Sequence, residues 1–162
     1  MQKHKREMIN HQLEAIKFVN SLRALRNELW RSEISEGKWT IAEIIGHFKP
    51  WDEFMLYQRL PYIFLEKVLP KAPDPQVTNA MAASISRGEP QQITIDKFIL
   101  NRKGIYKVIK EIPDSQLEAT FLLGDKWLSL YDYLRYLADH DRHHFNQIER
   151  AIHENDHLKK LS

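Results

Sequence analysis

The chain has 162 residues, no cysteine, five glycines and a formal net charge of +2 at pH 7. Without cysteine it has no disulfide, thiolate metal ligand or catalytic cysteine. Acidic and basic residues are interleaved, which argues against nucleic-acid binding. No apolar run approaches the roughly 20 residues that span a bilayer. We therefore expect a cytoplasmic protein of one domain, residues 1–162 with a core at about 8–154, that binds neither nucleic acid nor membrane.

Four segments show the three- and four-residue spacing of apolar positions that is typical of amphipathic helices. The predicted helices cover about 4–31, 40–70, 94–111 and 129–154. No pair of strands is evident between them. Four helices of this length predict an all-α protein, a four-helix bundle.

The second and fourth predicted helices both begin with a capping box. Thr40 precedes the second helix with Glu43 three residues later, and Ser129 and Asp132 repeat this spacing before the fourth. Pro50 lies inside the second helix, where its ring crowds the carbonyl four residues earlier, so we expect a kink or a restart there.

The connection between the second and third helices is long and rich in proline. It covers residues 70–93 and contains a segment, 76–86, that is compatible with a short helix. A connection of this length is typical of a lid or a crossover and permits the second and third helices to be parallel. Residues 113–127 predict a structured loop with one short helical turn.

Three of the eight histidines are His140, His143 and His144, in the stretch "LADHDRHHFNQIERAI" of the fourth helix. At 100° per residue, His144 lies within the apolar stripe, His140 on its flank and His143 away from it. His47 lies at the edge of the stripe of the second helix. The two edge histidines, His47 and His140, can meet at one metal ion with His144 between them, or each ring can be a partly buried histidine bonded to a backbone carbonyl.

A second pair with the same spacing, His153 and His157, lies in the polar stretch "HENDHLKK" near the end of the fourth helix. Because this stretch is polar throughout, we expect both rings to be solvated. H-x-x-x-H alone is therefore a weak signal of a metal site.

The segments "GKWTIAEIIGHFKPWDEF" and, about ninety residues later, "LADHDRHHFNQI" together resemble the DinB/YfiT-like superfamily of four-helix-bundle metalloproteins. The clustered "HDRHH" is most similar to the YfiT-type branch. The resemblance implies a metal site made of His47, His140 and His144, the same three residues that the helical periodicity selects.

Three neutral imidazoles leave part of the coordination sphere of a metal open, as catalytic sites do. Nitrogen ligands suit a divalent transition metal, with zinc or nickel foremost and iron or copper as alternatives. The resemblance implies a metal-dependent hydrolase, or a transferase that uses a low-molecular-weight thiol such as bacillithiol, acting on a small-molecule substrate. The alternative is a non-catalytic bundle whose metal site is structural, sensory or vestigial.

Two carboxylates, Asp52 and Asp141, fall within the apolar stripes of their helices. A buried carboxylate needs a partner or a functional reason. Each is a candidate catalytic residue, as a proton shuttle or as an acceptor for a ligand imidazole, or is paired across the bundle with a cation such as Arg23 or Arg26. The apolar residues of the first helix also suggest a homodimer.

Overall fold

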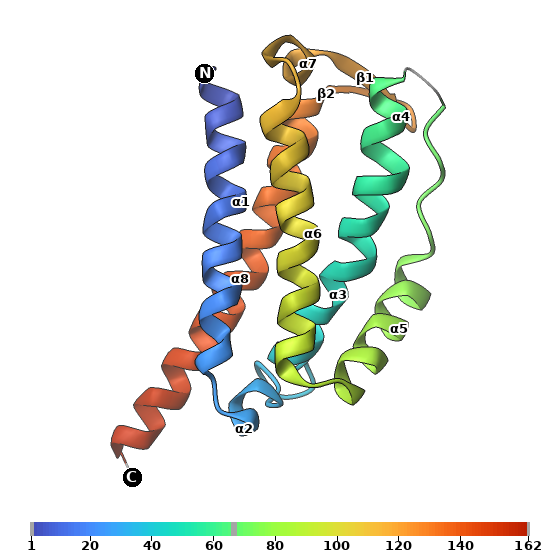
Figure 1. Ribbon diagram of the computed structural model, residues 1–162. Coiled ribbons are helices and arrows are strands. Elements are labelled where there is room, and N and C mark those ends of the chain that lie inside the picture. The colour runs from blue at the N-terminus through green and yellow to red at the C-terminus, as the bar shows by residue number, and fades with distance from the viewer. Residues whose placement is uncertain (1, 66–67, 162) are drawn as a thin grey trace.

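The computed structural model describes residues 2–65 and 68–161, and its helices form a four-helix bundle (Figure 1). The main helices are α1 (Lys3–Ser21), α3 (Ile41–Phe54), α6 (Gln91–Glu111) and α8 (Leu130–Leu161). Between them lie η1 (Leu22–Ala24), α2 (Asn27–Trp30), the π-helical turn η2 (Met55–Arg59), α4 (Leu60–Phe64), α5 (Pro75–Gly88), α7 (Asp114–Glu118), β1 (Thr120–Leu123) and β2 (Lys126–Ser129). The predicted all-α bundle is confirmed.

The bundle has an unusual order of directions. In Figure 1, α3 and α6 run the same way, whereas α1 and α8 run the opposite way. Two parallel helices in succession require the chain to return along the bundle, and the described residues 68–90 do so. The predicted long connection is confirmed, and its short helix is α5.

The apolar core consists of two clusters, one built from all four main helices and the other from α1, α6, α8 and the η2–α4 continuation of α3. One contains Val19, Ile44, Phe98 and Ile148, and the other contains Met8, Met55, Ile105 and Leu134. Each of these side chains is at most 5% exposed. Fully burying an aliphatic or aromatic side chain contributes about 1.5–3 kcal/mol, so the clusters supply most of the driving force for folding.

Both predicted capping boxes are present. The Thr40 hydroxyl accepts a hydrogen bond from the Glu43 amide at 3.1 Å, and the Glu43 carboxylate accepts one from the Thr40 amide at 3.1 Å. At the start of α8, the Ser129 hydroxyl accepts from the Asp132 amide at 3.0 Å and donates to its carboxylate at 2.9 Å. These bonds fix where α3 and α8 begin, and hence the height of every side chain along them.

The predicted first helix, 4–31, is too long, because α1 ends at Ser21. The side-chain amide of Gln91, at the start of α6, donates to the carbonyls of Leu22 and Leu25 at 2.9 and 3.1 Å. These carbonyls find their partner in a distant part of the chain, which favours an extended Leu25 over a continued helix. The cause of the break is therefore a tertiary contact.

The expected restart at Pro50 is wrong, since α3 passes through this residue without ending, and the alternative of a kink there stays a prediction. The irregularity lies at η2, where the amide of Leu60 bonds the carbonyl of Met55, five residues earlier. Pro61 follows directly and has no amide hydrogen to continue the α-helical pattern, so the wider π turn is adopted before it. The helix then ends at Phe64 rather than near residue 70.

The structure contains a β-hairpin that the sequence did not predict. β1 and β2 pair antiparallel from Thr120 opposite Ser129 to Leu123 opposite Lys126, with a two-residue turn in which Gly124 has φ +64°. Glycine at a positive φ is a common hairpin signal. The predicted short helical turn in this loop is confirmed as α7, and α8 runs to Leu161 rather than 154.

Within the described residues, no helix combines the length and apolar character needed to cross a membrane. On α1, Leu13 is 47% exposed. The homodimer suggested by the apolar residues of the first helix stays a prediction.

The helix α5 packs closely on α3 at Gly46. A Cβ atom at this glycine would lie 2.6 Å from the Cβ of Ser86, a separation that real Cβ atoms do not show. A Cβ atom at Gly88, by contrast, would have no atom within 4 Å, and this glycine is exposed. Close backbone approach at Gly46 therefore fixes α5 beside the first half of α3.

We expect Gly46→Ala to lower the free energy of unfolding by about 1–3 kcal/mol, because overpacking outweighs the better helix propensity of alanine. The matched control, Gly88→Ala, should leave stability unchanged or raise it by up to about 1 kcal/mol. Urea unfolding of both variants measures the difference. Equal stability of the two would contradict the close packing of α5 on α3.

Candidate metal centre

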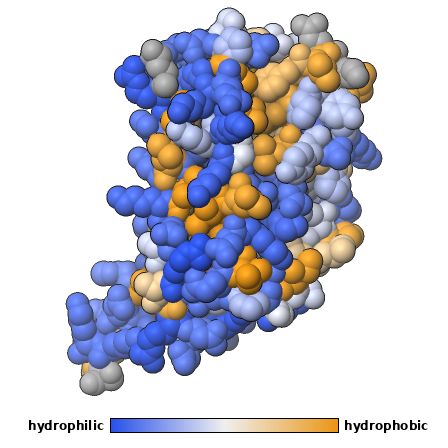
Figure 2. Space-filling view, viewed as in Figure 1, coloured by the Kyte–Doolittle hydropathy of each residue, from blue (hydrophilic) through white to orange (hydrophobic). Residues whose placement is uncertain are grey.

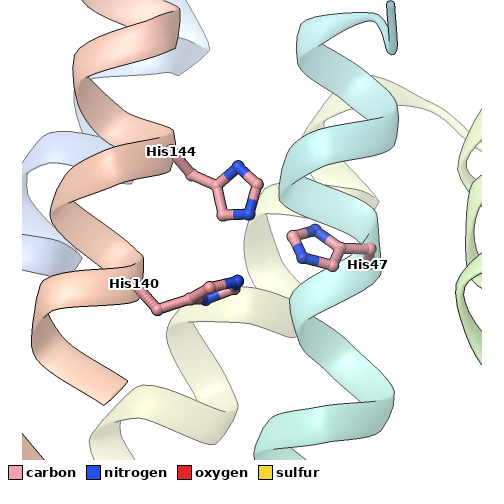
Figure 3. A group of neighbouring side chains, drawn as sticks. All are labelled: His47, His140 and His144. Carbon is pink, nitrogen blue, oxygen red and sulfur yellow. The ribbon is translucent and has the colours of Figure 1, made fainter. Parts of the chain in front are cut away.

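The structure brings His47, His140 and His144 together between α3 and α8 (Figure 3). Taking one ring nitrogen from each histidine, these atoms all lie within 4.8 Å of one another. The ring centroids of His47 and His144 are 4.8 Å apart, and those of His140 and His144 are 4.6 Å apart. The three histidines that the sequence selected thus form one cluster.

Regular helix geometry positions all three rings. His140 and His144 are four residues apart and project from one face of α8. His47 lies two turns after the Thr40 cap and is packed between aromatic rings, with centroids 5.0 Å from Trp39 and 4.6 Å from Phe48. Packing on both sides holds the His47 ring toward α8.

Hydrogen bonds select which ring nitrogen is available. Nδ1 of His47 donates to the carbonyl oxygen of Ile44, and Nδ1 of His144 donates to the side-chain oxygen of Gln147 at 2.9 Å. A ring whose Nδ1 carries the hydrogen has its lone pair on Nε2. His47 and His144 are therefore in the tautomer that binds a metal through Nε2.

All three rings favour the neutral form. Burial lowers the pKa of His47 to about 4. Burial also lowers the pKa of His140 and of His144. Only a neutral imidazole can bind a metal ion, so at neutral pH no proton has to be displaced from the cluster.

The cluster is open on one side. His47 is only 3% exposed, whereas His144 is half-buried and His140 is exposed. Tetrahedral coordination at about 2.0–2.1 Å places ligand nitrogens about 3.4 Å apart, so small ring rotations bring these atoms to a common ion. The donor set fits a three-histidine metal site that solvent reaches from the His140 side.

Asp52 and Asp141 both bind the guanidinium group of Arg102. Nε of Arg102 donates to Asp52 at 2.7 Å, and its terminal nitrogens hold both oxygens of Asp141, one of them at 3.0 Å. Asp141 also contacts Nε2 of His11 at 2.8 Å. The pairing with Arg23 or Arg26 is wrong: those side chains pair with Asp96 and Glu28 instead.

The four residues His11, Asp52, Arg102 and Asp141 form a buried layer, which we call the polar layer. Each is at most 5% exposed, and each comes from a different main helix. Burial raises the pKa of Asp52 to about 6, although Arg102 opposes it. Burial also acts to raise the pKa of Asp141, but Arg102 and His11 outweigh it and hold this pKa below its usual range.

The contacts of Asp52 and Asp141 within the described chain run to Arg102 and His11 rather than to the histidine cluster. Asp141 does act on the cluster through its charge, which favours a positive charge on all three rings. Its contacts are therefore structural and its effect on the cluster is electrostatic, and the catalytic roles of Asp52 and Asp141 stay predictions.

Sequence reasoning missed His11 and Arg102. Arg102 lies four residues after Phe98 and three before Ile105, and His11 lies three after Met8, so each is on the apolar stripe of its helix. A charged residue on such a stripe is the signal that would have found the partner of Asp52 and Asp141.

The remaining histidines of α8 lie outside the cluster. His143 is exposed as predicted, with its ring centroid 5.4 Å from that of His144. His153 and His157 are both exposed, so the prediction that this second pair is solvated is confirmed.

A model of the DinB superfamily matches residues 15–148, a range that includes the whole histidine cluster. The chain belongs to the DinB superfamily. The solved structure of YfiT from Bacillus subtilis, described as "a probable metal-dependent hydrolase with an unusual four-helix bundle topology", is similar to this DinB-superfamily chain, with a TM-score of 0.80. The sequences are 14% identical, and the match covers 96% of this chain and 90% of YfiT. No curated protein matches this chain with significance.

We expect Asp141→Asn to lower the free energy of unfolding by about 3–5 kcal/mol, because it leaves Arg102 buried with less than its full counter-charge. Asp139, two residues earlier on α8, has a side chain that is 68% exposed and pairs with Arg142 at the surface. Its replacement, Asp139→Asn, should change stability by less than about 1 kcal/mol. Equal losses in the two variants, measured by chemical unfolding, would refute the structural role of the polar layer.

Proposed function

We propose that His47, His140 and His144 bind one divalent transition-metal ion and that the chain is a metal-dependent hydrolase of a small-molecule substrate. The observation that carries this proposal is the convergence of three neutral imidazoles from two helices, with one side of the cluster open to solvent. The description of YfiT, a protein of the same fold, supports the choice of hydrolysis.

The three ligands have different parts in this site. His47 is buried and fixed by Ile44, so it is the rigid ligand, whereas His140 lies at the exposed edge where a substrate enters. When bound, a divalent ion with three nitrogen ligands lowers the pKa of a water or thiol and so provides a nucleophile at neutral pH. Zinc or nickel is the proposed ion, since both accept imidazole ligands.

The polar layer acts on the histidine cluster through the charge of Asp141. The negative charge of Asp141 acts on every ring of the cluster, although Arg102 opposes it at His140. Three neutral imidazoles bring no charge of their own to a divalent ion. We infer that this buried negative charge strengthens metal binding.

We expect chelator-treated protein to take up one zinc or nickel ion per chain after dialysis, as measured by elemental analysis. His47→Ala and His144→Ala should each lose at least 90% of this metal, because two nitrogen ligands hold an ion far more weakly than three. The double variant His153→Ala/His157→Ala is the matched control, since it removes the same H-x-x-x-H spacing from an exposed part of α8. A chain that cannot be loaded, or a control that loses metal equally, would contradict the site.

We expect the loaded protein to hydrolyse members of an ester and amide panel without added thiol, and His144→Ala to lose at least a hundredfold in kcat/KM. The same panel with bacillithiol and electrophilic substrates is the second arm of the experiment. Turnover only with a thiol would replace hydrolase by thiol S-transferase. Metal binding without turnover in either arm would leave a structural, sensory or vestigial site and overturn the enzymatic proposal.

A further inference from the structure

A cavity lies at the far end of the bundle from the start of α3, between α4, the segment after it and the β-hairpin. Its volume is about 1060 Å³, close to the upper end of the volumes of small-molecule sites, roughly 300–1,000 Å³. None of the three cluster histidines lines it. From His47 to Arg59, which does line it, the helix rises roughly 18 Å at 1.5 Å per residue. The cavity is therefore separate from the candidate metal centre.

Arg59 is a cation in the wall of this cavity that has no ionic partner among the described residues. The side chain is 9% exposed, and its Nε atom is buried without a hydrogen-bond partner in the described chain. The guanidinium group lies over the ring of Phe54, 4.8 Å from its centroid, and no carboxylate of residues 2–65 and 68–161 forms an ion pair with it. A buried N–H group without a partner is costly, and an anion in the cavity would give Nε of Arg59 the acceptor that it lacks among the described residues.

The position of Arg59 results from the irregular turn before Pro61. It is the last residue of the π turn η2, and its backbone angles, φ −109° and ψ −64°, depart from those of a regular helix. Such π turns often occur at functional sites. The turn holds the arginine at the cavity although the surrounding surface is apolar.

The rest of the cavity wall is mostly apolar, with a few neutral polar side chains, and the described residues that line it include no acidic one. Ile63, Phe64, Leu69 and Phe121 are partly buried there, and Trp127 is 70% exposed at its edge. Lys71 is the second cation among the described residues of the wall and is exposed. In Figure 2, apolar surface gathers over α4 and the hairpin, at the upper right of the view. A ligand with an apolar body and one negatively charged end would therefore complement this wall.

We propose that this cavity binds an organic monocarboxylate with an apolar body, whose carboxylate pairs with Arg59. The planar guanidinium presents paired donors that match the two oxygens of a carboxylate. One buried positive charge balances one negative charge, which favours a monocarboxylate over a phosphate dianion. The aliphatic and aromatic side chains of the wall bury the body of the ligand.

Calorimetric titration with octanoate and with its neutral counterpart octanamide tests the proposal. We expect octanoate to bind one site per chain and octanamide to bind at least tenfold more weakly. Arg59→Gln should weaken octanoate at least tenfold and leave octanamide unchanged, whereas Arg59→Lys, which keeps the charge, should fall between. Lys71→Gln is the matched control for a surface cation and should change affinity less than threefold.

A second set of measurements separates this cavity from the metal centre, because a carboxylate also binds metal ions. Octanoate should bind equally to His144→Ala and to wild-type protein, and Arg59→Gln should keep the wild-type helicity and metal content. Loss of binding in His144→Ala with no change in Arg59→Gln would place the acid at the histidines and overturn the proposal. Equal affinity for octanoate and octanamide, or binding of neither at millimolar concentration, would also overturn it.

Discussion

The bundle depends on the ion pairs that Arg102 makes with Asp52 and Asp141 in its interior. Removing three charged groups from water is costly, and only well-aligned hydrogen bonds offset this cost. With His11, the polar layer takes one residue from each main helix and separates the two apolar clusters. A slip of any helix by one turn would leave a buried charge unpaired. The layer therefore fixes the relative heights of the four helices, which apolar contacts alone do not specify.

The same layer orients the candidate metal ligands. Asp141 directly follows His140, and consecutive side chains leave a helix about 100° apart. When Arg102 and His11 hold Asp141 in the interior, the rotation of α8 is set, and His140 and His144 must lie on the side that meets α3. Arg102 also lies over the ring of Phe48, 5.3 Å from its centroid, and Phe48 packs against the neighbouring His47. The histidine cluster and the polar layer are thus packed against each other through Phe48 and share the helix α8.

The residues of the site were predictable from sequence to the extent that they follow helical periodicity. The capping box at Thr40 and the apolar stripes were enough to place His47, His140 and His144 on facing edges. Arg102 was missed because a partner for the carboxylates was sought by charge alone, on the first helix, rather than on the apolar stripe of the third. The end of α1 was not predictable in this way, since the carbonyls of Leu22 and Leu25, just after it, bond to the distant Gln91. The spacing of apolar residues thus predicted which side of its helix each site residue lies on, whereas the end of α1 depended on a tertiary contact.

The long connection joins these features into one architecture. Because α3 and α6 are parallel, the chain must leave the end of α4 and return along the bundle before α6 begins (Figure 1). Its first part, with Leu69, forms a wall of the Arg59 cavity, and its second part, α5, packs on α3 at Gly46, one residue before His47. An antiparallel order with a short loop would leave the cavity without this wall and would uncover the face of α3 beside the cluster. The crossover therefore forms part of the Arg59 cavity with its first part and covers α3 beside the histidine cluster with its second.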